Sequence, residues 1–354
     1  MGLIKKNVVK CDLASYIHYW RGVKKSGKTT LFYKLLLEKY GSLDKGVLLS
    51  IGNEIGYQAL DGLNYVECPD WATLVEAIDD LIDNKAEYGM DLICFDTVDE
   101  WVTIAKEEVK RLHKKAKGAA AEFNACFGGY GAPREKVVEL IDEQLTRVRR
   151  AGYGIIYIGH TKIRDIKEKN GDDYQQLTSN LSADYDGIFA NKADIVMTIA
   201  IEKNIDEAKH ISGTKRFMYF RSDGFVDAGG RFSDMPERVE YGADNYIKAF
   251  EEGVKGAIVG DVTDKDIQKR VKAEQKERKA KADEYIEKEK ETHIDIERNQ
   301  ELRSVIQDGF SSLESENKQI FKDKMAELGV KSFKNVDDIP TKSLETLVEL
   351  LNTF

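Results

Sequence analysis

The residues best suited to chemistry stand close together near the N-terminus. Gly22 and Gly27 enclose four residues and are followed directly by Lys28 and Thr29. In this GxxxxGK[ST] spacing the glycines let successive backbone N–H groups turn inward around phosphate oxygens. The lysine ammonium reaches the β- and γ-phosphates, and the threonine hydroxyl is a ligand for Mg²⁺. The sequence therefore predicts a loop that binds ATP and Mg²⁺ through Gly22, Val23, Lys24, Lys25, Ser26, Gly27, Lys28, Thr29 and Thr30.

An apolar segment that ends in an acidic residue provides the second candidate. Leu-Ile-Cys-Phe precedes Asp96, as expected of a buried strand whose last carboxylate holds a magnesium ion through its water shell. An acidic residue that ends a strand is often only a turn former, but together with the loop it predicts a metal site formed by Thr29 and Asp96. Asp99 and Glu100 follow, and they either act on the attacking water or place negative charge at a helix N-terminus.

These residues must be positioned by strands that alternate with helices. Short apolar runs predict strands, and amphipathic stretches between them predict helices, which together indicate a mostly parallel sheet covered by helices. The expected strands are 15–20, 46–51, 91–95, 154–158 and 195–201, and the expected helices include 30–40, 71–85 and 135–151. Further on, alternating segments at 216–221 and 224–232 predict a β-hairpin near the sheet edge, divided at Ser222-Asp223-Gly224.

Three further features resemble the RecA-like branch of P-loop ATPases. The strand 47–51 ends in Gly52-Asn53-Glu54, Asp96 continues as Thr97-Val98, and the strand 155–158 ends in Gly159-His160-Thr161-Lys162. Together with Lys25–Thr29 and Gly128–Gly131, these segments are most similar to phage RecA-like proteins of the Sak single-strand-annealing group and related phage nucleotide-binding proteins. The resemblance covers roughly residues 10–245 and implies a RecA-like P-loop NTPase core.

The resemblance also implies roles for two residues beyond the loop. Glu54 would be the glutamate that activates water, although Gly52-Asn53 replaces the acidic residue that usually precedes it. His160 would be the polar residue that senses the γ-phosphate and passes its state to a mobile loop. A carboxylate can deprotonate water and a histidine can donate to phosphate oxygen, which favours this division of roles. The alternatives are a surface carboxylate at Glu54 and a core histidine at His160.

The polar stretch from Lys162 to Asn191 reads as a long loop, which in RecA-like proteins contacts single-stranded DNA. Its side chains suited to phosphates and stacking are Lys162, Arg164, Lys167, Lys169 and Tyr174, with Tyr185 as an alternative stacking face. Interspersed acidic residues leave a solvated flap as the competing interpretation. Lys114, Lys115 and Lys117 form a second candidate patch, or simply a solvated helix face.

RecA-like ATPases commonly complete the site with a cation from the next subunit. Arg221 is the first choice for this catalytic role, with Lys215 and Arg216 as alternatives, while charge that protects an edge strand is the competing explanation. A donor supplied by a neighbour implies a homo-oligomer, either a ring or a filament.

Composition bounds the remaining architecture. The chain has 354 residues, a net charge of -9 and four cysteines without a CxxC pair, so neither a zinc site nor a disulfide scaffold is expected. No long apolar run predicts a membrane span, and we expect a cytoplasmic protein, in the bacterial host if it is phage-encoded. Between Asp264 and Arg303, 24 of 40 residues are charged, which predicts a helical linker. We predict an ATPase core at 1–255, this linker at 256–303 and a small helical module at 304–354.

The leading functional hypothesis is a DNA-stimulated ATPase that acts on single-stranded DNA in phage recombination or replication. A single-strand-binding or replication protein is then a possible partner. The alternatives are a helicase loader or clamp-loader-like switch whose main partner is a protein, and, less favoured, a small-molecule kinase. The kinase is less favoured because of the series Glu54, Asp96 and His160, and because the sequence has no obvious arginine-rich lid.

Overall fold

The computed structural model describes residues 4, 6–167, 171–205, 211–292, 296–333, 336 and 338–354. The chain divides into two compact units, Met1–Lys279 and Ala280–Phe354. The division at residues 255 and 303 that composition suggests stays a prediction. In the described parts of the chain, no helix is both long enough and apolar enough to cross a bilayer.

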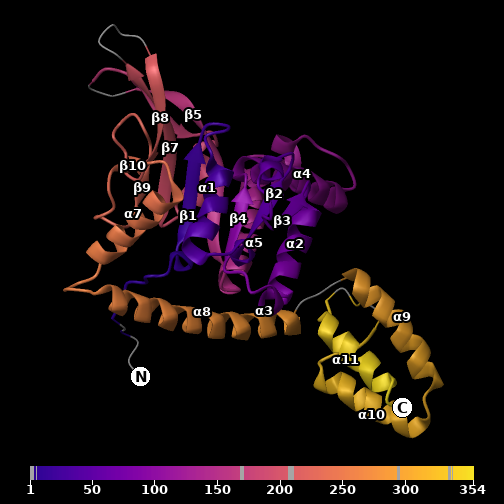
Figure 1. Ribbon diagram of the computed structural model, residues 1–354. Coiled ribbons are helices and arrows are strands. Elements are labelled where there is room, and N and C mark those ends of the chain that lie inside the picture. The colour runs from indigo at the N-terminus through magenta and orange to yellow at the C-terminus, as the bar shows by residue number, and fades with distance from the viewer. Residues whose placement is uncertain are drawn as a thin grey trace. The chain divides into compact units, whose positions relative to one another are not determined.

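The first unit is built on a twisted, mostly parallel sheet, which confirms the predicted α/β fold (Figure 1). Its strands run in the order β10-β8-β7-β1-β5-β4-β2-β3, with β6 paired to β5 and β9 paired to β7. The strands are β1 Ile17–Gly22, β2 Gly46–Ile51, β3 Tyr65–Cys68, β4 Leu92–Asp96, β5 Gly154–Ile166, β6 Tyr174–Ser179, β7 Ile195–Ile205, β8 Ile211–Tyr219, β9 Gly229–Gly230 and β10 Arg238–Glu240.

Helices lie between the parallel strands and after the last strand. They are α1 Lys28–Leu35, α2 Trp71–Asp83, α3 Lys85–Tyr88, α4 Val98–Lys117, α5 Ala132–Arg150, α6 Ala183–Ala190, α7 Ala243–Gly256 and α8 Asp264–Thr292. A π-helical turn, Leu36–Tyr40, continues α1. Short 3₁₀ turns occur at Leu13–Ser15, Leu43–Lys45, Gly56–Ala59 and Phe123–Gly128.

Successive side chains of the strands point to opposite faces of the sheet and so contribute to two apolar layers. On one face Trp20 packs edge-on against Tyr246 of α7, with ring centroids 5.0 Å apart. On the other face Phe95 stacks on Trp101 of α4 at 4.4 Å. The helices α1 and α7 contact each other, and α2, α4 and α5 form a separate contacting group. The sheet is therefore covered by helices on both faces, which fixes the ends of its central strands.

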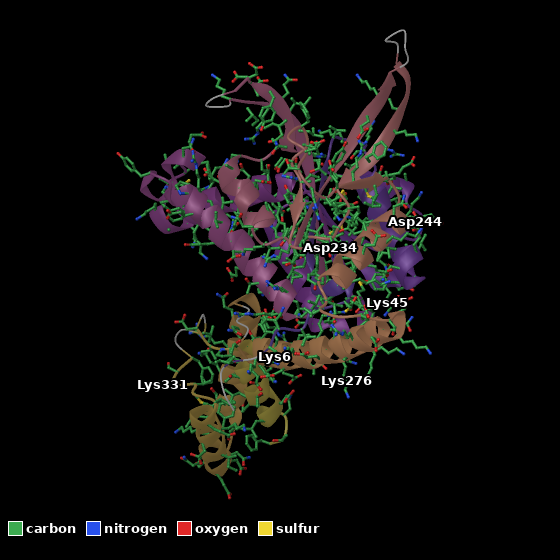
Figure 2. The ribbon with its side chains drawn as sticks, turned by 90° about the vertical axis from the view of Figure 1, so that its left-hand side faces the viewer. Lys6, Lys45, Asp234, Asp244, Lys276 and Lys331 are labelled. Atoms are coloured by element: carbon green, nitrogen blue, oxygen red, sulfur yellow. The ribbon has the colours of Figure 1, made fainter. Side chains whose placement is uncertain are left out.

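Two antiparallel hairpins extend beyond the carboxyl ends of the parallel strands (Figure 2). One is formed by β5 and β6, and the other by β7 and β8. The predicted edge hairpin between 216–221 and 224–232 is therefore wrong in its partner, because β8 pairs with β7 and β10 instead. In the segment after Gly224, Gly229–Gly230 pairs with β7, and Val226 forms an isolated bridge with Leu177 of β6.

The predicted loop at 162–191 is also corrected by the structure. Its first residues extend β5 to Ile166, and β6 and α6 follow within the same stretch. Charged side chains alternate along this part of β5 with exposed or half-buried apolar ones. This hairpin stands clear of the apolar layers, so it carries no apolar run of the kind that marks a buried strand.

All four cysteines of the sequence are free thiols and are buried. Burial is the main cause that raises the pKa of each thiol, at Cys11, Cys68, Cys94 and Cys126. Cys94 is fully buried in β4, where it is a small side chain of the core. The predicted absence of a disulfide framework stays an interpretation of the sequence.

The second unit contains a small helical bundle with its own core. Its helices α9 Ile296–Ser312, α10 Ser315–Glu327 and α11 Thr341–Leu351 follow the end of α8. Gly329 adopts a left-handed conformation (φ 71°) just past α10, and Pro340 is the residue before α11. The core residues are Leu302, Ile306, Phe321, Val330, Val336, Leu344 and Leu347.

Candidate nucleotide-binding site

The loop from Gly22 to Thr29 connects the end of β1 to the start of α1. Gly27 has a left-handed φ of 101° and precedes the first helical residue, Lys28. A Cβ at Gly22 would lie 2.6 Å from Ser26 Oγ, so a larger residue would displace the turn. Both glycines are therefore needed for the tight approach of this loop to the N-terminus of α1, where free N–H groups favour an anion.

Lys28 lies inside the curve of the loop. Its ammonium donates to the carbonyl oxygens of Gly22 at 2.9 Å and Val23 at 3.1 Å. Burial lowers the pKa of this lysine, while the nearby carboxylates, Asp96 first, oppose the shift. The lysine is thus placed by backbone carbonyls where a cation can meet phosphate oxygen.

Thr29 and Asp96 form the predicted metal-binding pair. The Thr29 hydroxyl donates to Asp96 Oδ2 at 2.7 Å, although 67 residues separate them in the chain. Burial at the end of β4 raises the pKa of Asp96 to about 6, and the hydrogen bond from Thr29 opposes this rise. A hydroxyl and a carboxylate held together in this way supply the oxygen ligands that Mg²⁺ prefers.

Glu54 and His160 meet at the carboxyl edge of the sheet. His160 Nε2 lies 3.3 Å from Glu54 Oε1, and His160 Nδ1 lies 3.4 Å from the Lys28 ammonium. The hydrogen bond with His160 is the main cause that lowers the pKa of Glu54. Strand β5 lies between β1 and β4, so His160 is next to the phosphate loop. Glu54 follows β2 and contacts His160 from the opposite side of the site. The structure therefore brings together Lys28, Glu54 and His160, three of the residues selected from the sequence.

Asp99 binds two groups of the β5–β6 hairpin. Its Oδ2 accepts the backbone N–H of His160 at 2.8 Å, and its Oδ1 accepts the side-chain amide of Asn180 at 2.9 Å. Asn180 in turn donates its own N–H to the carbonyl of His160. Both carboxylate oxygens are engaged in this bracing, which sequence reasoning did not anticipate, because Asn180 is 81 residues away.

Glu100 follows Asp99 in the first turn of α4 and faces the loop after β2. A Cβ at Gly52 would come within 2.6 Å of Glu100 Oε2, so these two residues are in close contact. Burial is the main cause that raises the pKa of Glu100, followed by the charges of Glu54 and Asp99. Glu100 is therefore near enough to remain the competing candidate for the carboxylate that acts on water.

Comparison with known families decides which class of site this is. Residues 16–232 match the model of a family described as an AAA domain. The chain belongs to the AAA domain family. A search of curated proteins found no match.

The geometry of this AAA domain fits the ligands that such P-loop ATPases bind, ATP with Mg²⁺. Lys28 and the N-terminus of α1 suit the phosphates, and Thr29 with Asp96 suits the metal. Among the described residues, Ser26 Oγ is a buried polar atom in the loop without a hydrogen-bond partner in the protein. A polar ligand in the loop would satisfy it.

Two residues brace the outer side of the loop in this AAA domain. Arg216 Nη1 donates to the carbonyl of Ser26 at 3.1 Å, and the Tyr241 hydroxyl donates to that of Gly27 at 2.8 Å. The Arg216 guanidinium also lies 4.4 Å above the Tyr241 ring. Tyr241 lies beyond the matched residues and was not selected from the sequence, since a lone aromatic after an edge strand gives no signal.

The other cations considered as donors lie elsewhere. Lys215 Nζ is 4.0 Å from Glu240 Oε1 on β10. Arg221 is exposed and follows β8, and its backbone N–H is directed at the carbonyl of Glu237. Because Tyr219 is level with Thr198 and Thr198 with Arg21, Arg221 lies on the far side of Arg21 from the phosphate loop. A contribution of Arg221 to this site therefore requires another subunit.

The candidates for nucleic-acid contact are distributed over the β5–β6 hairpin. Lys162 and Lys167 are exposed, and Tyr174 meets Phe225 edge-on at 6.3 Å. Arg164 instead turns inward, where Nη2 donates to the carbonyls of Ser179, at 3.1 Å, and Leu181. Lys169 lies outside the described residues.

The alternative stacking face and the second lysine patch have other environments. Tyr185 is buried and the Lys106 ammonium lies 4.6 Å above its ring, so this ring is not open to a base. Lys114, Lys115 and Lys117 occupy the last turn of α4. Positive charge is favourable at a helix C-terminus, which explains this cluster without a ligand.

Proposed function

We propose that this protein is a RecA-like ATPase of the phage Sak single-strand-annealing and nucleotide-binding group, which hydrolyses ATP while acting on single-stranded DNA. The observation that carries the proposal is the chain of contacts from Glu54 through His160 to Lys28. It places a carboxylate, an imidazole and an ammonium around the position where the loop would hold the terminal phosphate.

Each residue then has a defined role in hydrolysis. Glu54 is kept ionised by its hydrogen bond with His160, and it accepts a proton from the attacking water. Lys28 would stabilise negative charge on the phosphoryl group, and Thr29 with Asp96 would hold the metal. His160 contacts both Glu54 and Lys28, so a change in charge within the loop alters its hydrogen bonding.

The proposed action on DNA rests on the position of His160 within the β5–β6 hairpin. Asn180 donates its backbone N–H to the carbonyl of His160 at the base of the hairpin, and the hairpin carries Lys162, Lys167 and Tyr174. Lysines bind phosphates and an aromatic ring stacks on a base, which is the combination used for single strands. The state of the nucleotide site would therefore be coupled to the strand-binding surface.

The decisive test measures ATPase rate with and without single-stranded DNA, together with mass in solution. We expect stimulation by DNA and a homo-oligomer. An ATPase insensitive to DNA but stimulated by a replication protein would support the loader alternative. Phosphorylation of a metabolite would instead identify a kinase.

Catalytic roles are tested with Glu54→Gln and Glu100→Gln as a matched pair. We expect Glu54→Gln to bind ATP normally and to lose at least about a hundredfold in turnover, as for removal of a general base. Glu100→Gln should retain most activity, because that carboxylate contacts Gly52 and is not hydrogen-bonded to His160. The reverse result would contradict the RecA-like assignment of Glu54.

A further inference from the structure

The helical bundle of the second unit contains a cavity of about 930 Å³. It lies between α9, the end of α10 and the turn that follows α10. Its apolar lining includes Ile306, Phe310, Met325 and Phe333. Ile306 is fully buried in the bundle core, whereas the other three side chains pack against that core and remain partly exposed. The cavity is therefore an opening into the core that can accept a side chain from outside.

The charges beside this cavity are all of one sign. Lys322 and Lys331 line it, and no acidic side chain does so among its described residues. Within the described chain neither lysine has an ion pair. Lys324, which lies on α10 with Lys322, is instead paired with Glu327 at 2.9 Å. Lys331 is labelled on this unit in Figure 2.

The local charge contrasts with that of the whole protein. Between residues 318 and 334 the sequence has five lysines and two acidic residues, while the chain carries a net charge of -9. A basic rim around an apolar opening is thus a local feature, which indicates complementarity to a negatively charged partner.

We propose that this cavity is a docking site for an acidic peptide segment of another protein, one that inserts apolar side chains between α9 and α10. The apolar lining would receive side chains at helical spacing, as in helix-in-groove recognition. Lys322 and Lys331 would pair with carboxylates that flank them. This site is separate from the nucleotide site, and the proposal does not depend on the function proposed for that site.

A peptide fits these observations better than a nucleic acid strand does. Single strands bind along extended basic grooves with exposed aromatic faces. Here the basic residues are two lysines, and the aromatic rings form part of the cavity wall next to the buried core. Phe310, for example, packs against Phe321 of the core with centroids 5.3 Å apart.

The test uses the full-length protein and fluorescence anisotropy with three labelled probes. The first is a peptide of about 16 residues with leucines at i, i+4 and i+7 and glutamates on both flanks. The second has lysines in place of the glutamates, and the third is single-stranded DNA. We expect the acidic peptide to bind in a salt-sensitive manner and the lysine peptide to bind at least about tenfold more weakly. Comparable binding of both peptides, or no binding of the acidic one, would overturn the proposal.

Variants locate the binding on the protein. Lys322→Glu and Lys331→Glu should each weaken binding of the acidic peptide. Lys342→Glu should not, because Lys342 is an exposed lysine on α11 that does not line the cavity. Ala326→Trp should block the cavity, since Ala326 lines it. The double variant Lys322→Glu/Lys331→Glu should gain affinity for the lysine peptide, which shows that it is folded. Equal effects of Lys342→Glu, or loss of DNA binding alone in the cavity variants, would refute peptide docking here.

Discussion

Asp96 carries a carboxylate that is almost completely buried at the end of β4, beside the Thr29 hydroxyl. Its pKa of about 6 in the folded protein exceeds the ordinary value of 3.8. The folded state therefore holds a proton on this group at pH values where the unfolded chain has released it. Stability from this difference is complete below the unfolded pKa and is lost as pH rises through the folded pKa.

This difference predicts a specific pH dependence in the absence of nucleotide and Mg²⁺. Between roughly pH 4 and pH 7, wild type should lose about 3 kcal/mol of unfolding free energy relative to Asp96→Asn, which has no proton to release. Urea denaturation of both proteins across this range measures the effect. Parallel pH profiles would show that Asp96 is ionised throughout.

Asp99 connects α4 with both strands of the β5–β6 hairpin. It lies in the first turn of α4, yet its two oxygens bind the His160 backbone in β5 and the Asn180 side chain just after β6. A single carboxylate thus fixes the base of the β5–β6 hairpin and the backbone of the residue that faces Lys28. It is a positioning residue, because its two carboxylate oxygens are held by His160 and Asn180.

We therefore expect Asp99→Ala to separate turnover from binding. ATP affinity should stay within about twofold, while turnover falls at least about tenfold, because His160 is no longer held in place. Hydrogen exchange should also accelerate in β6, where the hairpin loses its anchor. Asp165→Ala is the control, since among the described residues the Asp165 carboxylate accepts a hydrogen bond from the exposed Gln175 alone. Similar behaviour of the two variants would contradict the bracing role.

The accuracy of prediction from sequence also differs from element to element. The phosphate loop and the apolar strand before Asp96 are local patterns, and β2 was predicted with its observed bounds. The part of β5 that pairs with β6, Thr161–Ile166, has no apolar run, because it projects beyond the helices that cover the sheet. The charged and polar residues of this hairpin therefore resemble the sequence of a loop.

Contacts between distant residues were likewise out of reach. Tyr241 and Asn180 act through hydrogen bonds to residues 214 and 81 positions away, and no spacing rule connects such pairs. The choice between Arg216 and Arg221 depended on the register of β8 against β7, which residue type alone does not specify. Register places Arg216 at the loop of its own chain and Arg221 away from it.

At the scale of the whole molecule, the different positions of Arg216 and Arg221 allow a test of how subunits assemble. Arg221→Ala should bind nucleotide but lose turnover, and mixing it with Lys28→Ala should restore part of the activity. In a mixed ring or filament some interfaces pair an intact loop with an intact Arg221 from the neighbour. Arg216→Ala should not be rescued in this way, because Arg216 contacts the loop of its own subunit.

Steady-state ATPase rates across mixing ratios provide the measurement, with light scattering to confirm that the subunits co-assemble. Co-assembly without any rescue of Arg221→Ala would show that Arg221 does not act between subunits. Rescue of Arg216→Ala to the same extent would place that arginine between subunits instead.

The four buried thiols can be used as chemical probes of local opening. A maleimide or disulfide reagent can modify each cysteine only when the surrounding structure opens, so the labelling rate at each site reports a local opening free energy. Cys94 lies on β4 two residues before Asp96, whereas Cys126 lies beside α4 in a separate turn. We expect ATP with Mg²⁺ to slow modification of Cys94, as read by mass spectrometry, and to leave Cys126 nearly unchanged. Equal protection of both would mean that the nucleotide stabilises the whole unit, which opens as one.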